Sequence, residues 1–189
     1  MRGAFQVWAE KLLFRMDGET LCLEAQGEHS LRVRAVPIDG RLEGEDFALL
    51  PTDSFSGILH THIHIDENKA SIENGRIRAE IDGTGRLTFF QGDRLLLREY
   101  ARDSRSENPL EQFSLEVHAR TFRAHRGGDY ALDVRFEADP SERLYGMGQY
   151  QQEALNLKGC HLELAQRNSQ ASVPFLVSSK GYGFLWNNP

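Results

Sequence analysis

The chain has 189 residues, enough for one domain whose hydrophobic core needs no metal or disulfide. Its 22 Lys and Arg against 28 Asp and Glu give a formal net charge of −6, which argues against a nucleic-acid binder or a protein held on an anionic membrane. Hydrophobic residues make up 40% of the chain, which excludes a disordered protein, yet runs such as Leu95-Leu96-Leu97 are too short to span a membrane.

The N-terminus does not read as a secretion signal, because it lacks an uninterrupted apolar stretch and carries a charge by Glu10. The two cysteines, Cys22 and Cys160, are too few for a disulfide framework. One bridge between them is compatible with the sequence, but two buried thiols in a reducing compartment are the favoured interpretation. We therefore expect a cytoplasmic protein.

The dominant hydrophobic period along the chain is two residues. Apolar and charged or polar side chains alternate over residues 31–36, 76–82, 113–118 and 132–137. This alternation places the apolar side chains on one face and the polar ones on the other, as half-buried strands require. Sheets with one solvated face are typically antiparallel, so we predict antiparallel pairing.

Turn signals separate the predicted strands, and residues 72–97 therefore predict a meander of short strands. Residues 101–111 are polar and predict an exposed loop, while 142–153 is ambiguous but too glycine-rich for a long helix. The pattern predicts an all-β antiparallel sandwich forming a single domain over residues 1–189. The turns are Asp39-Gly40, Glu73-Asn74-Gly75, Asp82-Gly83-Thr84-Gly85, Gln91-Gly92-Asp93 and Gly127-Gly128-Asp129.

Three histidines, His60, His62 and His64, alternate along one predicted strand and so share one of its faces. Neighbouring members of this set start about 6.8 Å apart at a rise of about 3.4 Å per residue, so a pair is able to converge on one Zn²⁺. The outer two are too far apart, and no matching ligand cluster lies nearby in the sequence. We expect a polar strand face opposite Leu59, Ile63 and Ile65, with a zinc site as the weaker alternative.

Local sequence motifs for other catalytic chemistry are absent. The chain has no G-x-S-x-G, H-E-x-x-H, P-loop or Cys-x-x-Cys motif, and Gly146-Met147-Gly148 lacks the third glycine of a dinucleotide fingerprint. Carboxylates are plentiful, but sequence spacing in a β protein does not reveal the pair that a glycosidase needs. No cofactor is predicted.

The C-terminal part carries longer apolar runs interrupted by amides, a composition that suits sugar hydroxyls. On composition alone, a central strand pair with a structured loop explains it better. The order of its motifs, however, resembles the N-terminal domain of glycoside hydrolase family 31, and weaker agreement extends back to about Leu31. The motifs are Leu144-Tyr145-Gly146-Met147-Gly148-Gln149, Leu157-Lys158-Gly159, Glu163-Leu164-Ala165-Gln166-Arg167-Asn168 and Pro174-Phe175-Leu176-Val177-Ser178-Ser179-Lys180-Gly181-Tyr182-Gly183-Phe184-Leu185-Trp186-Asn187-Asn188-Pro189.

The resemblance implies a galactose mutarotase-like β-supersandwich that precedes a (β/α)₈ catalytic barrel in α-glucosidases, α-xylosidases and related transglycosylating enzymes. A barrel of about 250 residues does not fit in this chain, so the catalytic aspartates lie outside it. The resemblance thus implies an N-terminal module of a retaining α-glycosidase that packs on its own barrel and is inactive alone. It also implies that the last strands of the sandwich are missing, and an unpaired edge of that kind predicts a dimer through strand addition.

In the family, a loop of this domain reaches over the barrel mouth on the leaving-group side, and residues 166–171 match it. The resemblance implies that Gln166, Arg167, Asn168 and Ser169 contact an α-linked oligosaccharide. Members often place an Arg-Asp pair in the loop, whereas Asn168 follows Arg167 here, so an amide replaces the acidic contact. The sequence does not separate glucosidase from xylosidase specificity.

Two other functions remain open at this point. A freestanding carbohydrate-binding module needs an exposed aromatic platform, and an independent mutarotase rests only on the analogy of fold. The candidate platform residues are Tyr145, Tyr150, Phe175, Tyr182 and Trp186.

Overall fold

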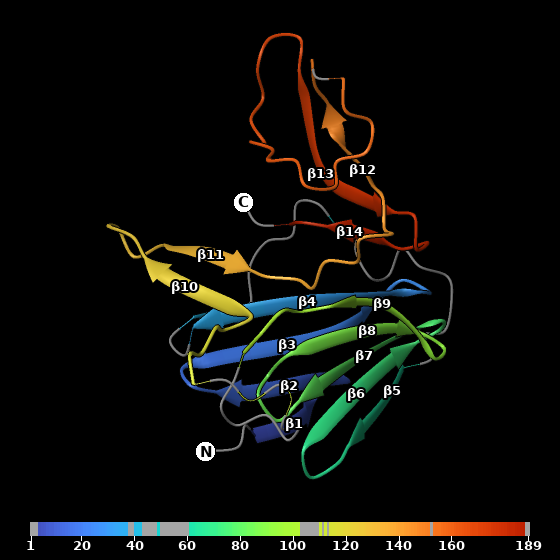
Figure 1. Cartoon of the computed structure of the whole chain (residues 1–189). Helices are drawn as coiled ribbons and strands as arrows, with labels where there is room; N and C mark the ends of the chain where they lie inside the picture. The colour runs from blue at the N-terminus through green and yellow to red at the C-terminus, as the bar shows by residue number, and fades with distance from the viewer. Residues whose placement is uncertain are drawn as a thin grey trace. The chain divides into compact units, whose positions relative to one another are not determined.

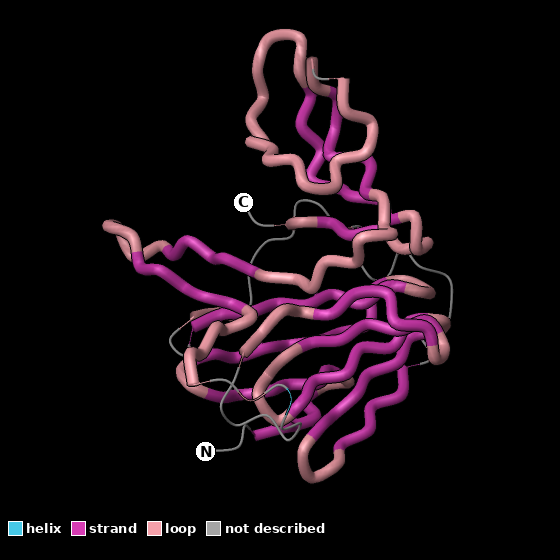
Figure 2. The backbone as a smooth tube through the Cα atoms, viewed as in Figure 1, coloured by secondary structure: helices cyan, strands magenta, loops and turns pink. Residues whose placement is uncertain are grey.

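The computed structural model describes residues 4–37, 40–42, 49, 61–102, 110, 112, 114–151 and 153–187. These residues form antiparallel β-strands joined by loops, with no α-helix among them (Figure 2), which confirms the predicted all-β fold. None of them forms a helix long and apolar enough to cross a membrane. The chain divides into two compact units, Met1–Glu137 and Ala138–Pro189, each described by itself below. The prediction of a single domain stays a prediction.

The first unit contains two larger sheets and a separate hairpin (Figure 1). A four-stranded sheet has the order β1-β2-β3-β4, and a five-stranded meander has the order β5-β6-β7-β8-β9. The hairpin pairs β10 with β11. The strands are β1 Ala4–Trp8, β2 Lys11–Met16, β3 Glu19–Gln26, β4 Ser30–Pro37, β5 Thr61–Ile65, β6 Lys69–Asn74, β7 Ile77–Asp82, β8 Leu87–Gln91, β9 Arg94–Arg98, β10 Arg120–Ala124 and β11 Tyr130–Val134.

The core of this unit lies between the two larger sheets. Strands β2 and β3 supply one half and strands β6, β7 and β8 the other, and the apolar members of each alternating pattern point inward. The predicted strands at 31–36 and 76–82 and the meander over 72–97 are confirmed as β4, β7 and β6–β9. The fully enclosed side chains of the cluster are Leu12, Phe14, Leu21, Leu23, Ala70, Ile72, Ala79, Ile81 and Leu87.

Two sequence predictions for this chain are wrong. The described part of 113–118 forms no strand: Val117 makes a bridge with Arg102, and Leu115 is exposed, so its alternating pattern does not produce a ladder among the described residues. Of the two thiols, Cys22 is buried but Cys160 is exposed, and both are free. Burial raises the pKa of the Cys22 thiol. The loop predicted at 101–111 lies mostly outside the described residues.

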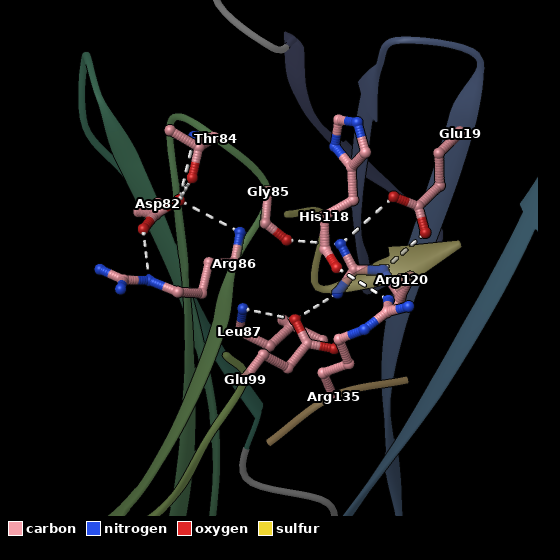
Figure 3. A network of polar contacts seen from close by, with 10 residues as sticks. All are labelled: Glu19, Asp82, Thr84, Gly85, Arg86, Leu87, Glu99, His118, Arg120 and Arg135. Atoms are coloured by element: carbon pink, nitrogen blue, oxygen red, sulfur yellow. Dashed lines mark hydrogen bonds and ion pairs between the residues drawn. The ribbon is translucent and has the colours of Figure 1, made fainter. Parts of the chain in front are cut away.

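A buried ion cluster ties four segments of the first unit together (Figure 3). The Arg120 guanidinium on β10 pairs with Glu99 and with Glu19 of β3, with 2.6 Å from its Nε to Glu19 Oε1. It also donates to the Gly85 carbonyl at 2.6 Å, while the Leu87 N–H donates to Glu99 at 2.8 Å. Burial raises the pKa of Glu99 although Arg120 opposes that shift.

Steric crowding explains why a glycine occupies position 85 in this cluster. Gly85 has φ +85°, and a Cβ placed there lies 2.8 Å from the Phe14 ring, so a larger residue collides with the core. The turn before it is held by Asp82, whose carboxylate accepts from the Thr84 N–H at 2.9 Å and the Arg86 N–H at 3.1 Å. This turn aims the Gly85 carbonyl at Arg120 (Figure 3).

The second unit is a three-stranded antiparallel sheet of order β12-β13-β14, formed by β12 Leu144–Gln149, β13 Ala171–Ser178 and β14 Gly183–Leu185. Pro174 in the central strand has no N–H to donate, and the register between β12 and β13 shifts at this point. Gly146, Met147 and Gly148 all have positive φ there, and a Cβ on Gly148 lies 2.0 Å from the Ala171 carbonyl oxygen. The motif thus encodes a β-bulge.

A single buried carboxylate joins four segments of the second unit. Glu142 Oε1 accepts from Ser178 Oγ at 2.5 Å and from the Tyr182 hydroxyl at 2.8 Å. Its Oε2 pairs with Lys158 Nζ at 3.2 Å. Burial raises the pKa of Glu142, but the three hydrogen bonds outweigh that effect and leave the pKa below its ordinary 4.5. Several motif residues of the C-terminal part therefore serve the scaffold.

The first prediction concerns the buried ion cluster. Arg120→Ala leaves Glu99 buried without its cation, and such a loss costs about 3–5 kcal/mol of unfolding free energy. Arg123→Ala is the matched control, since Arg123 pairs with Asp133 on the surface and exposed pairs contribute about 0–1 kcal/mol. Urea unfolding of both variants measures the difference, and equal losses contradict the role given to Arg120.

The second prediction concerns pH. Because the folded-state pKa of Glu142 is lowered, its stabilisation is complete above pH 4.5 and is lost as the pH falls through the lower folded value. Amide exchange in β12 and β13, corrected for intrinsic rates, should accelerate on acidification. Glu142→Gln should weaken this pH dependence, leaving the part due to Asp139, whose pKa is also lowered by its hydrogen bonds from Ser141 and Lys180, and Glu153→Gln should keep it. An unchanged acid response in Glu142→Gln rejects the assignment.

Candidate functional site

The four residues predicted to contact substrate lie in the long connection between β12 and β13 (Figure 1). The connection ends in a tight turn from Arg167 to Gln170, in which the Gln170 N–H donates to the Arg167 carbonyl at 3.1 Å. Ser169 has φ +65°, a left-handed conformation that non-glycine residues adopt mainly in turns. The structure therefore places Gln166, Arg167, Asn168 and Ser169 together on one exposed turn.

The base of this turn is fixed by side chains. The Gln166 amide spans the backbone of Ser172: its Nε2 donates to the Ser172 carbonyl at 3.1 Å, and its Oε1 accepts from the Ser172 N–H at 3.3 Å. The Ser172 hydroxyl donates to the Ala165 carbonyl at 2.9 Å and accepts from the Tyr150 hydroxyl at 2.9 Å. We call Tyr150, Gln166 and Ser172 the loop clamp.

The four predicted residues differ in how many of their side-chain donors and acceptors are already used within the domain. Gln166 uses both ends of its amide on the scaffold, and Arg167 forms an ion pair with Glu163 that still leaves guanidinium N–H groups. Within the described residues, the Asn168 and Ser169 side chains are exposed and bond to no other group. Asn168 offers a donor and an acceptor, as a pair of sugar hydroxyls requires.

The sequence analysis did not identify Tyr150 and Ser172 as members of the loop clamp, nor Glu142 as the shared hydrogen-bond partner of three residues. Each is a common polar residue with no motif of its own, and each acquires its role from partners far along the chain. Glu142, for example, meets Tyr182 across 40 positions. The only indirect signal was that three of the Glu142 partners, Lys158, Ser178 and Tyr182, lie in the recognised motifs.

The five aromatic residues considered for a sugar platform do not form one. Tyr150 and Tyr182 direct their hydroxyls to Ser172 and Glu142, and Trp186 stacks with Phe184 at 6.1 Å between ring centroids. Tyr145 is half-buried, which leaves Phe175 as the exposed member of the five.

One face of the second unit is apolar and exposed. Val173, Phe175 and Val177 alternate along β13 with exposed fractions of 50%, 42% and 43%, and Leu185 of β14 lies opposite Phe175 in the register. A Cβ at Gly183 lies 2.5 Å from the Phe175 ring, so this glycine makes room for the ring to lie across β14. The four residues, here called the β13 face, form a continuous apolar surface of the kind that marks an interaction site.

The histidine alternation does not assemble a metal centre in the described residues. His62 and His64 are exposed on β5, where His64 Nε2 lies 3.0 Å from Asp66 Oδ1, while His60 lies outside the described residues. No cluster of three or more His, Cys, Asp or Glu side chains in the part of the chain that the structure describes is placed to hold a metal ion. On the opposite face, Ile63 packs against the core as expected, whereas Ile65 at the end of the strand is 39% exposed, contrary to the expectation, and Leu59 lies outside the described residues.

The third prediction tests the loop clamp. Gln166→Ala removes two hydrogen bonds, each contributing about 0.5–1.5 kcal/mol, so exchange of the Ser172 amide should accelerate about tenfold or more. Asn168→Ala, in the same turn, should leave that rate unchanged because the exposed Asn168 side chain forms no hydrogen bond or ion pair within the described residues. Hydrogen exchange followed by NMR measures both variants, and equal rates contradict the clamp.

Comparison with known proteins agrees with this architecture. The family described as glycosyl hydrolase 31 N-terminal galactose mutarotase-like domain matches residues 20–189. An uncharacterized family 31 glucosidase, ORF2, from Pseudescherichia vulneris is 44% identical over 96% of this chain, and the chain spans 35% of that protein.

Solved structures give the same result. An α-xylosidase of this family from a soil metagenome, determined with xylose, superposes with a TM-score of 0.88 at 46% identity over 98% of this chain and 28% of its own. The α-xylosidase from Xanthomonas citri has a TM-score of 0.73 at 26% identity, over 99% of this chain and 18% of its own. The chain therefore belongs to the galactose mutarotase-like N-terminal domain family of glycoside hydrolase family 31, as its C-terminal motifs indicated.

Proposed function

We propose that this chain acts as the N-terminal β-sandwich domain of a retaining α-glycosidase, with α-xylosides as the favoured substrates and α-glucosides as the second class. The observation that carries the proposal is the match to a solved α-xylosidase at 46% identity, of which the chain spans 28%. The curated relative with 44% identity is likewise much longer, and the chain spans 35% of it. The catalytic groups are then supplied by the remainder of the larger enzyme.

The carboxylates of this chain support that division of labour. Glu99 and Glu142 are the acidic residues buried among the described ones, and each is already engaged, Glu99 by Arg120 and Glu142 by Lys158 and two hydroxyls. Each is committed to partners within its own unit, whereas a retaining glycosidase uses two available carboxyl groups that face each other about 5–5.5 Å apart. No residue here is assigned as nucleophile or acid.

Two surfaces of the second unit have roles in this proposal. The β13 face supplies apolar contact for the catalytic portion, whose docking removes Val173, Phe175 and Val177 from water. The turn at 167–170 supplies Asn168 and the remaining Arg167 N–H donors to the leaving-group sugar. The loop clamp holds that turn in place, so the contact is made without ordering a loose segment.

The fourth prediction tests this role in a chimera in which the chain replaces the matched segment of the soil-metagenome α-xylosidase. The chimera should hydrolyse a 4-nitrophenyl α-xyloside, whereas the chain alone should not. Asn168→Ala in the chimera should raise KM for an α-xylosyl disaccharide about threefold to tenfold, the equivalent of one lost hydrogen bond. For the nitrophenyl substrate, which lacks sugar hydroxyls in its leaving group, KM should change little.

The control is Arg123→Ala, an exposed position in the first unit. An inactive but folded chimera, or hydrolysis by the chain alone, rejects the proposed function. Unchanged KM for both substrates in Asn168→Ala rejects only the contact. Saturable NMR shifts of the isolated chain with an α-xylosyl disaccharide support instead a freestanding carbohydrate-binding module.

A further inference from the structure

Among the described residues, strand β1 forms an edge of the four-stranded sheet. It pairs on one side with β2 in an unbroken register from Ala4↔Arg15 to Trp8↔Lys11. On its other side, no described strand pairs with it. Such a row of backbone N–H and C=O groups is a template for a further strand unless the sequence blocks it.

The other edges in the described structure are each protected. A charged residue, a proline, a bulge or a short length blocks most of them, and the histidines of β5 make that edge polar. In contrast, β1 reads Ala-Phe-Gln-Val-Trp, five residues without charge, proline or bulge. The protecting features are Arg32, Arg34 and Pro37 on β4, Arg94, Arg98 and a register shift at β9, Arg123 on β10, Asp133 on β11, the bulge of β12, the three-residue length of β14, and His62 and His64 on β5.

The edge strand is also anchored to its neighbour β2. Phe5 packs on Phe14 of β2 with 5.0 Å between ring centroids, which anchors the strand to the core. The β1–β2 turn has positive φ at Ala9 and Glu10, the conformation whose twist matches that of paired strands. Val7 and Trp8 remain exposed, at 51% and 49%.

We infer that two copies of this chain associate edge to edge through β1, antiparallel and centred on Gln6. In this register Phe5 of one copy lies opposite Val7 of the other, and Ala4 lies opposite Trp8. Apolar side chains therefore face each other, and in each pair a large side chain lies opposite a smaller one. No residue of β1 carries a charge, although each copy has a net charge of −6. The nearest charged group is the Arg15 guanidinium of β2, which donates to Gln6 Oε1 at 2.9 Å. The symmetric pairing joins the two sheets and closes both edges at once. The inference is independent of the proposed function.

The fifth prediction is a defined dimer of the 189-residue chain. Sedimentation and light scattering over about a hundredfold range of concentration should give the mass of two chains at the upper end. Val7→Lys places a charge opposite Phe5 of the other copy, next to the centre of the contact, and should raise the dissociation constant about tenfold or more. Leu95→Lys on β9, another exposed apolar edge residue, should leave it unchanged. Urea midpoints of both variants check that each remains folded.

Cross-linking tests the register. In a background with Cys160→Ser, Gln6→Cys should form a disulfide dimer because the two copies of this residue face each other. Ala4→Cys should not cross-link with itself, since the antiparallel register separates its two copies by about four residues, or about 13 Å. A mixture of Ala4→Cys and Trp8→Cys chains should cross-link. A monomer at every concentration, an open-ended polymer, or a dimer unaffected by Val7→Lys and not trapped by Gln6→Cys overturns the inference.

Discussion

A buried charge must be paired, and this requirement organises each unit of the chain. In the first unit the Arg120 guanidinium meets Glu19, Glu99 and the Gly85 carbonyl, which come from three separate stretches of sequence. In the second unit the Glu142 carboxylate gathers Lys158, Ser178 and Tyr182. Each charge is neutralised only when its segments are correctly placed. The apolar packing supplies most of the driving force, while the ion clusters specify which loops meet.

The loop between β12 and β13 shows how such a scaffold presents a ligand-binding turn. At the base of the loop, polar side chains hydrogen-bond to the backbone and hold it in place. The Gln166 amide, for example, uses its donor and its acceptor on Ser172. At the tip of the loop, the exposed Asn168 and Ser169 side chains bond to no other group within the described residues. A residue is therefore not a substrate ligand merely because it lies in a motif shared with the family. The distinction depends on whether its donors and acceptors are already satisfied.

The two surfaces proposed for contacts differ in kind. The β13 face is a sheet face with side chains as its contact groups, and it suits a large apolar partner. The β1 edge offers backbone hydrogen bonds and suits an extended strand. A domain that uses the first surface for the rest of its own enzyme retains the second for a further copy, so the two contacts do not compete for the same groups.

The sequence by itself determined the all-β class, the strands at 31–36 and 76–82 and the meander, because alternation and glycine turns are local signals. It missed β2, where Leu12, Leu13 and Phe14 are all buried, since a strand covered on both faces loses its alternation. It predicted a strand at 113–118 because alternation reports side-chain pattern and not the presence of a pairing neighbour. Only the tertiary structure showed that Arg120 pairs with Glu19, 101 positions away. The partner of a buried charge is set by proximity in the folded chain, and no periodic sequence pattern reports it.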